Sequence, residues 1–344
     1  MIVIGVGHDH ALANFQCVAS MEDVYDVAGF VRVPGEEGQK PDFNKGFAHI
    51  PALTLDEAFA VAGLDAVIIE TEDPKLVYYA NMAAQRGLHV FMDKPGSQSP
   101  EDFEAMLATV YQNKKVFGIG YIYRFHPLVQ KTLAMVKEGK LGKIYSVEAH
   151  MSRDDKIEKR RWLQQFRGGM TFFLGCHMID LIHMFMGVPE QIIPLNACTM
   201  PEKYAAEDLG MAAFRYPVGM SFYKVCAAEP GGFMRRQLVV CGSLGTVEIC
   251  PLEEHWDGAP YHCISQSRCS FREEKDTPMQ WTKKGTVVSC VPYHRYRAMF
   301  FDFARRVLDG RSSTKEELLR EATVHRILLA ACGITCDFKG EISI

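Results

Sequence analysis

Short apolar runs alternate with amphipathic stretches through the first third of the chain. The runs at 2–4, 65–71 and 88–92 have apolar interiors, which is typical of strands buried on both faces of a parallel sheet. Helical segments lie between and after them, such as Lys75 to Gly87 and the segment that Ser99 caps. This order predicts successive right-handed β-α-β units, which form a doubly wound parallel sheet.

The pattern changes after residue 122. A helix is expected from Pro127 to Gly139, and from Val188 onward strand-like runs follow one another. We therefore expect a first domain at 1–122 and a second at 123–344, whose last long helix covers about 315–336. The sequence contains no internal repeat and no low-complexity linker.

The composition is that of an ordinary globular protein. Of 344 residues, 48% are hydrophobic and 23% are charged, and the formal net charge is -4, which gives no reason to expect nucleic acid or an anionic membrane as partner. No apolar run approaches membrane-spanning length, and Met1 runs directly into a strand without a signal peptide. The eleven cysteines include no Cys-x-x-Cys pair, so we expect reduced thiols in a cytoplasmic protein, without disulfides or a zinc site.

A glycine turn follows the first apolar run. Gly5 and Gly7 are spaced as in turns that let a pyrophosphate approach the backbone beside the start of a helix. His10 stands where such fingerprints usually carry a third glycine. His8 and His10 are candidates for contacting the cofactor phosphate or a substrate, although a loop-surface or helix-capping role also suits them. Thr71, at the end of a later buried run, is a further candidate cofactor contact.

The second predicted strand, 25–32, ends at Arg32 instead of the acidic residue that usually binds the ribose of NAD. An arginine there can pair with the 2′-phosphate of NADP or stack on the adenine. Alternatively, Arg32 lies on the surface and Glu36 or Glu37 supplies the acidic function. The arginine favours NADP as the cofactor, and NAD is kept as the alternative.

The run that ends at Met92 delivers Asp93 and Lys94 to the carboxyl edge of the predicted sheet, because Pro95 cannot continue a strand ladder. Ligands bind at that edge in open parallel sheets. Lys94 is therefore either a solvated loop cation or a group that exchanges a proton with a ligand.

Several motifs, in order along nearly the whole chain, resemble the Gfo/Idh/MocA family of NAD(P)-dependent oxidoreductases. They are Gly5-x-Gly7, 64–69, 86–95, 120–127, 138–144, 168–180 and 240–248. The resemblance implies a Rossmann domain followed by an α/β domain with a large, mostly antiparallel sheet whose open face forms subunit interfaces. It also implies that the last long helix packs back on the first domain.

Oxidation of a carbinol carbon by hydride transfer requires a base for the hydroxyl proton. By resemblance, Lys94 and His177 belong to that catalytic group and also bind substrate. Lys94 is expected to contact the cofactor as well. His177 and Asp180 lie three residues apart on a predicted helix and share roughly one face, so Asp180 can orient the imidazole or bind substrate. Tyr123, which faces either the cleft or the core, is a further candidate for binding substrate.

One member of the usual family site is missing. The family carries an aspartate four residues before His177, where this chain has Phe173. A phenyl ring neither takes up a proton nor binds a sugar hydroxyl. Three outcomes are open: turnover with Lys94 and His177 alone, another cofactor-dependent reaction such as glycoside cleavage through transient oxidation, or cofactor binding without turnover.

Two other clusters are singled out by residue type. A basic stretch could bind an acidic or phosphorylated substrate, and a solvated loop explains it equally well. Its members are Arg160, Arg161, Trp162 and Arg167. His183 follows Asp180 by three residues, but helical geometry turns it far round from His177, so we expect no metal there.

The sequence thus predicts a cytoplasmic NAD(P)-dependent oxidoreductase without a metal. Its substrate is expected to be a sugar, a polyol or a related small hydroxy compound, and the chain is expected to form a homo-oligomer through the second sheet. The competing hypothesis is a cofactor-binding sensor or regulatory protein without turnover.

Overall fold

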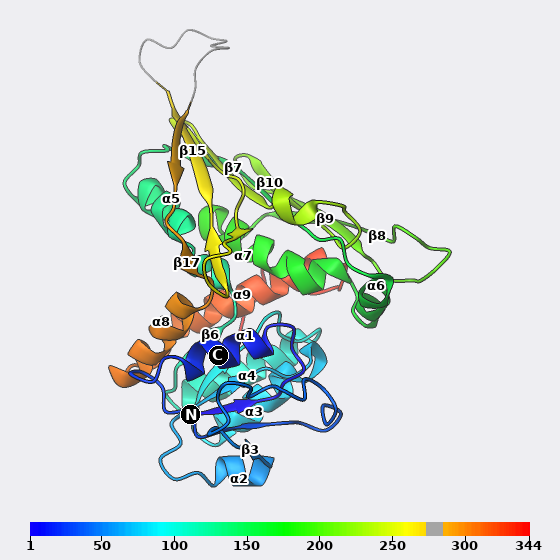
Figure 1. Ribbon diagram of the computed structural model, residues 1–344. Coiled ribbons are helices and arrows are strands. Elements are labelled where there is room, and N and C mark those ends of the chain that lie inside the picture. The colour runs from blue at the N-terminus through cyan, green and yellow to red at the C-terminus, as the bar shows by residue number, and fades with distance from the viewer. Residues whose placement is uncertain (273–284) are drawn as a thin grey trace. The chain divides into compact units, whose positions relative to one another are not determined.

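The computed structural model describes residues 1–272 and 285–344. They form two compact units (Figure 1). The first unit comprises Met1–Tyr121, Tyr296–His325 and Gly340–Ile344, and the second comprises Ile122–Arg295 and Arg326–Lys339. A segment that comes late in the sequence, 296–325, thus belongs to the same unit as the first strand.

The first unit is built on a six-stranded parallel sheet with the strand order β3-β2-β1-β4-β5-β6. Its strands are β1 (Ile2–Ile4), β2 (Gly29–Val31), β3 (Ala52–Leu53), β4 (Ala66–Ile69), β5 (His89–Met92) and β6 (Phe117–Ile119). This is the order of a doubly wound Rossmann sheet, with its switch point between β1 and β4. The predicted fold of the first domain is therefore confirmed, although β2 covers only the end of the predicted strand 25–32.

The first unit also contains helical segments. They are α1 (Ala11–Ala19), α2 (Leu55–Phe59), α3 (Leu76–Gln85), α4 (Pro100–Gln112), α8 (Arg297–Leu308) and the first part of α9 (Lys315–Ala331), with the short 3-10 helix η1 (Asp73–Lys75). The predicted cap of α4 is present, since Ser99 Oγ accepts a hydrogen bond from the Asp102 backbone N–H at 3.1 Å. The ring of Phe91 in β5 lies 4.8 Å from that of Phe300 and 5.6 Å from that of Phe303, so α8 packs on β5.

The second unit contains an eight-stranded sheet with the order β16-β15-β12-β11-β7-β10-β9-β8. Its strands are β7 (Ile144–Ser152), β8 (Gln191–Ala197), β9 (Leu209–Arg215), β10 (Met220–Cys226), β11 (Gln237–Gly242), β12 (Gly245–Ile249), β15 (Gln266–Phe271) and β16 (Thr286–Ser289). Strands β7 and β10 run parallel, and the other neighbouring pairs among these described strands are antiparallel. The predicted large, mostly antiparallel sheet is confirmed.

Within the second unit, helices cover one face of this sheet. Helices α5 (Pro127–Lys137) and α7 (Cys176–Met186) lie against it (Figure 1), with α7 on β7 and β10. Along β10, Ser221, Tyr223 and Val225 are buried, whereas Met220 and Phe222 expose 62% and 38% of their surface. Burial that alternates with a period of two is expected for a strand that packs one of its faces on the core.

The remaining elements of the second unit are short. They are the three-stranded sheet β13 (Glu254–His255), β14 (His262–Ile264) and β17 (Tyr293–His294), and the helical segments α6 (Ile157–Trp162), η2 (Ile122–Phe125), η3 (Leu163–Gln165), η4 (Thr171–Gly175) and η5 (Gly232–Arg235). The π-helical η4 leads directly into α7. Helix α9 ends at Ala331, short of the predicted residue 336. Gly333, two residues later, adopts φ +74°, which is typical of a glycine that follows the end of a helix. No helix in the described part of the chain is both long and apolar enough to cross a membrane.

Candidate active site

The glycine turn after β1 has no room for side chains. Gly5 adopts φ +94°, and a Cβ there would lie 2.5 Å from the backbone nitrogen of Thr71. A Cβ on Gly7 would lie 2.5 Å from Glu36 Oε1 and 2.9 Å from the backbone nitrogen of Glu72. The two glycines therefore let the residues after β1 lie directly against those after β4, and the turn leads into the start of α1. This is the local geometry of sites that bind a pyrophosphate.

A buried carboxylate holds the same turn. Glu36 is fully buried and accepts hydrogen bonds from the backbone N–H groups of Val6 at 2.8 Å, Gly7 at 2.9 Å and Val33 at 3.2 Å. Glu37 is exposed and accepts from the backbone N–H of its neighbour Gly35. Of the two acids considered from the sequence, Glu36 is thus the one at the glycine turn.

Arg32 donates its hydrogen bonds to backbone carbonyl groups. Its guanidinium contacts the carbonyl oxygen of Gln39 and, at 2.8 Å, that of Lys40. The guanidinium carbon lies 5.7 Å from the centre of the Phe30 ring. These contacts fold the loop after β2 back over the strand end, so Arg32 shapes the loop that carries Glu36.

The carboxylate of Asp93 is the centre of a buried polar cluster beyond β5. Its Oδ2 lies 3.0 Å from His8 Nδ1, 3.1 Å from His10 Nδ1 and 3.1 Å from Asn14 Nδ2. Its Oδ1 accepts a hydrogen bond from the backbone N–H of Lys94 at 2.7 Å. Asp93 and His8 are fully buried, and Asn14 is 1% exposed. The cluster therefore joins the residues that follow β1 and β5 to the first turns of α1.

Burial and charge set the ionisation of this cluster. Burial, and next the charge of Asp93, raise the pKa of Glu70, whose Oε1 accepts from Asn14 Nδ2 at 2.7 Å, well above its usual value. Burial alone would raise the pKa of Asp93, but interactions with His8 and His10 outweigh it and hold that pKa well below its usual value. Burial lowers the pKa of His10 to about 4. Burial thus favours the protonated form of Glu70 and the neutral form of the His10 ring, whereas the two histidines favour the ionised form of Asp93.

Lys94 is fully buried, and its backbone is held on both sides. Its N–H donates to Asp93 Oδ1 at 2.7 Å, and its carbonyl oxygen lies 3.1 Å from His8 Nε2. Because a carbonyl oxygen only accepts, His8 Nε2 carries the proton in that contact. Asp93 and His8 thus fix the position from which the Lys94 side chain extends.

In the second unit, α7 turns His177 and Asp180 toward η2. The Asp180 carboxylate is 1% exposed and accepts from Arg124 Nε at 3.0 and 2.9 Å and from Nη2 at 2.6 Å. The His177 ring is 2% exposed and lies 5.3 Å from the ring of Tyr123, at 89° to it. The shared helix face predicted for His177 and Asp180 is confirmed, and Arg124 holds the aspartate in place.

Tyr123 belongs to a buried charged network. It is 2% exposed, and its hydroxyl donates to Glu253 Oε1 at 2.6 Å. Arg236 and Arg295 contact the same oxygen. Burial, together with the charge of Glu253, raises the pKa of Tyr123. The phenol is therefore protonated, and its role in binding a substrate stays a prediction.

At the position of the expected aspartate, the ring of Phe173 forms an aromatic pair with Trp162. Its ring is 1% exposed and lies 5.3 Å from the ring of Trp162. The Nζ of Lys159 lies 4.4 Å from the centre of the Phe173 ring and 3.5 Å from that of Trp162. These two rings thus hold a cation of the chain itself, and position 173 supplies no acid.

The structure brings together most of the residues predicted to bind the cofactor, at the carboxyl edge of the first sheet. Gly5, Gly7, His8 and His10 follow β1, Thr71 follows β4, Lys94 follows β5, and Arg32 lies at the end of β2. The sequence did not single out Asn14 or Glu70. The signal that could have found them was a His-x-His spacing after one strand together with acids at the ends of two others.

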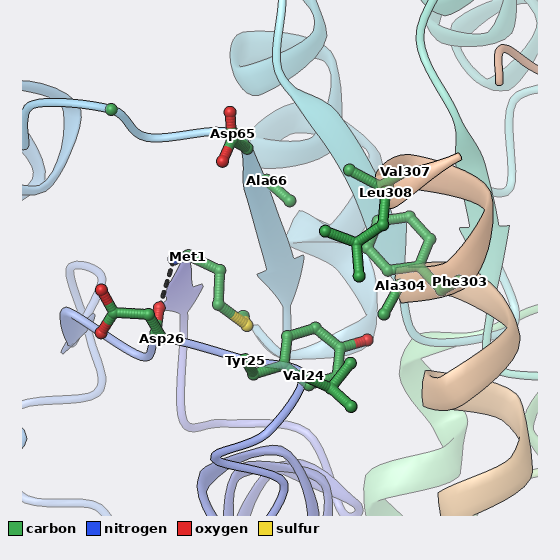
Figure 2. A pocket seen from close by; sticks show the side chains of 11 residues that line it. Met1, Val24, Tyr25, Asp26, Asp65, Ala66, Phe303, Ala304, Val307 and Leu308 are labelled. Atoms are coloured by element: carbon green, nitrogen blue, oxygen red, sulfur yellow. Dashed lines mark hydrogen bonds between the residues drawn. The ribbon is translucent and has the colours of Figure 1, made fainter. Parts of the chain in front are cut away.

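A cavity of about 220 Å³ lies at the opposite edge of this sheet (Figure 2). Met1 precedes β1 there, and its amino group donates to the carbonyl oxygen of Asp26 at 2.6 Å. Asp65 and Ala66 at the start of β4 also line it. Ligands of open parallel sheets bind at the carboxyl ends of the strands, so this cavity is separate from the predicted cofactor site.

Comparison with known proteins identifies the family. Residues 1–121 match the model described as "Oxidoreductase family, NAD-binding Rossmann fold". Residues 129–248 match the model of the GFO/IDH/MocA C-terminal domain. The chain belongs to the Gfo/Idh/MocA family, and its first unit contains an NAD-binding Rossmann domain. The expected cofactor, NAD or NADP, is thereby confirmed.

Some of the relatives are named as enzymes that act on sugars or their derivatives. The chain is 28% identical over 143 residues to "D-xylose 1-dehydrogenase (NADP(+)) 2" of Haloferax volcanii, which covers 41% of this chain and 42% of that protein. It is 26% identical over 263 residues to the 2,7-anhydro-N-acetylneuraminate hydratase of Escherichia coli, which covers 72% and 66%. The chain thus spans about half the length of the curated relatives it matches.

Solved structures show the same fold over the whole chain. Levoglucosan dehydrogenase in complex with NADH and levoglucosan has a TM-score of 0.75 at 15% identity, covering 96% of each chain. Aldose-aldose oxidoreductase from Caulobacter crescentus, with glycerol, has a TM-score of 0.73 at 18% identity, also covering 96% of each. At these identities the likeness shows the fold alone.

Proposed function

We propose that this protein is an NAD(P)-dependent oxidoreductase that transfers a hydride between the nicotinamide and a sugar, a polyol or a related hydroxy compound. The observation that carries the proposal is the glycine turn, which is held against Thr71 and Glu36 in a domain of an NAD-binding family. The names of relatives that act on xylose and levoglucosan support the substrate class. When bound, the cofactor would supply a hydride acceptor or donor at its nicotinamide ring.

The residues of the turn would hold the cofactor. The backbone from Gly5 to His10 would face the pyrophosphate, because neither glycine carries a side chain and α1 begins there. His8 and His10 would contribute through this backbone, since both rings contact Asp93. Thr71 would line the cofactor from the end of β4.

Lys94 and His177 would exchange the hydroxyl proton of the substrate. Lys94 is fully buried and extends from a backbone fixed by Asp93 and His8. His177 is 2% exposed, and its ring packs on Tyr123. Burial of such groups strengthens their hydrogen bonds with a bound substrate by excluding water. Tyr123 and Asp180 complete the proposed substrate-binding set.

NAD is the better match to the loop after β2. In Rossmann domains an acid after β2 binds the ribose hydroxyls, and it disfavours the additional 2′-phosphate of NADP. Glu36 supplies a buried carboxylate there, whereas the Arg32 guanidinium donates to the carbonyl oxygens of Gln39 and Lys40. This arrangement supports a preference for NAD over the NADP that Arg32 alone would suggest.

The location and assembly of the chain are also part of the proposal. All eleven cysteines are free thiols, which suits the reducing cytoplasm. The outward face of the second sheet carries Ile193, Leu195, Met220 and Phe222, each between 38% and 62% exposed. A second copy of the chain would cover this apolar face in a homo-oligomer.

The function is tested with a panel of aldoses, polyols and inositols while reduced cofactor is followed at 340 nm. On a substrate that turns over, Lys94→Ala and His177→Ala should each lower kcat by a factor of about 100 or more, as expected for loss of proton transfer. His183→Ala on the same helix and Lys131→Ala on the surface are matched controls. Wild-type turnover in both Lys94→Ala and His177→Ala would remove these residues from the mechanism. Cofactor binding without turnover on the whole panel would favour the sensor.

A further inference from the structure

Three ligand atoms of the first unit converge as they would around a metal ion. His8 Nδ1, His10 Nδ1 and Asp93 Oδ2 all lie within 4.8 Å of one another. The oxygen is 3.0 Å from the first nitrogen and 3.1 Å from the second. A tetrahedral zinc ion with bonds of about 2.0–2.1 Å places its ligand atoms about 3.3 Å apart. The cluster is therefore close to the dimensions of a zinc site.

The two ring nitrogens of His8 have different partners. Its Nε2 faces the Lys94 carbonyl oxygen at 3.1 Å and therefore carries the ring proton. The His10 backbone N–H points at Nδ1 from 3.2 Å, which uses Nδ1 as an acceptor. The same Nδ1 lies 3.0 Å from the ionised Asp93 oxygen. A lone pair of His8 Nδ1 thus faces a carboxylate oxygen, an arrangement that a cation bound between the two atoms would stabilise.

A fourth candidate ligand atom, Glu70 Oε2, lies beside these three. Glu70 is fully buried, and its Oε2 has no hydrogen-bond partner among the described residues. This oxygen lies 3.8 Å from His8 Nδ1. Asn14 Nδ2 donates to Glu70 Oε1 at 2.7 Å and to Asp93 Oδ2 at 3.1 Å, so one amide orients both carboxyl groups. Such support behind the ligands is typical of built metal sites.

The local charges favour a divalent cation. Glu70, Asp73 and Asp93 place three buried carboxyl groups around His8, and Asp73 Oδ1 lies 3.9 Å from its Nε2. The ammonium of Lys40 binds the carbonyl oxygens of Val6 and His8 at 2.6 and 2.5 Å and opposes a further cation. Two imidazoles with two carboxylates suit zinc better than magnesium or calcium, which prefer oxygen ligands alone.

We propose that His8, His10, Asp93 and Glu70 bind a zinc ion, with Asn14 orienting the two carboxyl groups. The site differs from the sequence-based expectation of no metal, because its ligands come from residues after three different strands. Binding would release the proton from Glu70, since a carboxylate must be deprotonated to ligate. The ion would tie the glycine turn to the backbone of Lys94, and the proposal is independent of the substrate.

The test uses the full chain with any affinity tag removed, so that no foreign histidines bind metal. The protein is dialysed against a chelator, and Zn²⁺ is returned during calorimetry in competition with a chelator of known affinity. We expect uptake of one Zn²⁺ per chain with release of protons and a rise in Tm. His10→Ala should weaken binding by at least about 100-fold and Glu70→Gln by about 10- to 100-fold, the range found when metal-site contacts are removed.

His49→Ala, on an exposed loop of the same unit, is the matched control and should bind as wild type does. Far-UV circular dichroism reports whether each variant is folded. The side chain of His10 is 14% exposed, and Glu70→Gln keeps the shape of the side chain. Absence of zinc uptake by the wild-type protein would overturn the proposal. Equal affinity in wild type, His10→Ala and Glu70→Gln would overturn it as adventitious binding.

Discussion

His126 shows how single residues of this chain are held in one protonation state. Its Nδ1 accepts from the backbone N–H groups of Leu128 at 3.1 Å and Val129 at 3.3 Å, which caps α5. Its Nε2 donates to the carbonyl oxygen of Leu252 at 2.7 Å. These contacts specify the neutral ring, and burial lowers the pKa of His126 to about 4.

The stability of the protein should depend on pH through His126. The unfolded pKa is about 6.5, so the contribution of the neutral ring is complete above that pH and is lost as pH falls toward the folded value of about 4. His126→Asn keeps a capping side chain without this titration. The difference in unfolding free energy between wild type and variant should shrink by about 2 kcal/mol from pH 7.5 to pH 5. Urea unfolding at both pH values measures it, and an unchanged difference would contradict the neutral assignment.

Glu36 is the residue on which cofactor choice should depend. Replacing it with glutamine keeps its size and removes the charge that would repel a 2′-phosphate. We expect Glu36→Gln to weaken NADH binding by about tenfold, on the order of one charged hydrogen bond. The ratio of NADH affinity to NADPH affinity should therefore become smaller. Arg32→Ala should leave the preference for NADH in place. Fluorescence titration with both cofactors measures the two affinities. If wild-type protein prefers NADPH and Arg32→Ala abolishes that preference, then Arg32 and not Glu36 selects the cofactor.

At the scale of elements, the buried strands are the part that the sequence predicts best. The apolar interiors of β1, β4 and β5 identify strands covered on both faces, and Ser99 identifies the start of α4. The ends of elements are less well predicted. Helix α9 ends at Ala331 and β2 begins only at Gly29, because ends depend on which backbone groups find partners in other segments.

The glycine turn gives a prediction at this scale. In Gly7→Ala the added methyl group would lie 2.5 Å from Glu36 Oε1 and 2.9 Å from the Glu72 backbone nitrogen, so the turn must shift. We expect NADH affinity to fall by more than about tenfold, since a displacement of this turn disturbs the backbone that receives the pyrophosphate. Gly38→Ala is the control, because no atom lies within 4 Å of a Cβ placed there. Equal binding in the two variants would show that the turn does not contact the cofactor.

For the whole molecule, the outward face of the second sheet is the surface that we propose for contact with another copy of the chain. Along β10 buried residues alternate with exposed ones in the expected period of two, and Ile193 and Leu195 of the edge strand β8 are exposed as well. Exposed apolar residues grouped in this way commonly mark interfaces. The family resemblance implied the same face.

The oligomer is tested by charging this face. Leu195→Asp and Met220→Asp replace side chains that are 50% and 62% exposed, so the fold of the single chain should survive. We expect light scattering after gel filtration to give a dimer or larger assembly for wild type and a smaller species for the double variant. Leu308→Asp, at a 74% exposed position on α8, is the control and should leave the mass unchanged. A monomeric wild-type protein would contradict the proposal.

The sequence by itself determined the doubly wound sheet, the antiparallel second sheet and the family. Apolar runs and glycine spacing report on strands and turns, which arise from residues close together along the chain. The tertiary structure decided which of Glu36 and Glu37 reaches the glycine turn, and it buried Tyr123 against Glu253. It also brought His8, Glu70 and Asp93 together from residues after three strands. Such contacts depend on strand order and helix packing, because residues far apart in the chain become neighbours only when the sheet has formed.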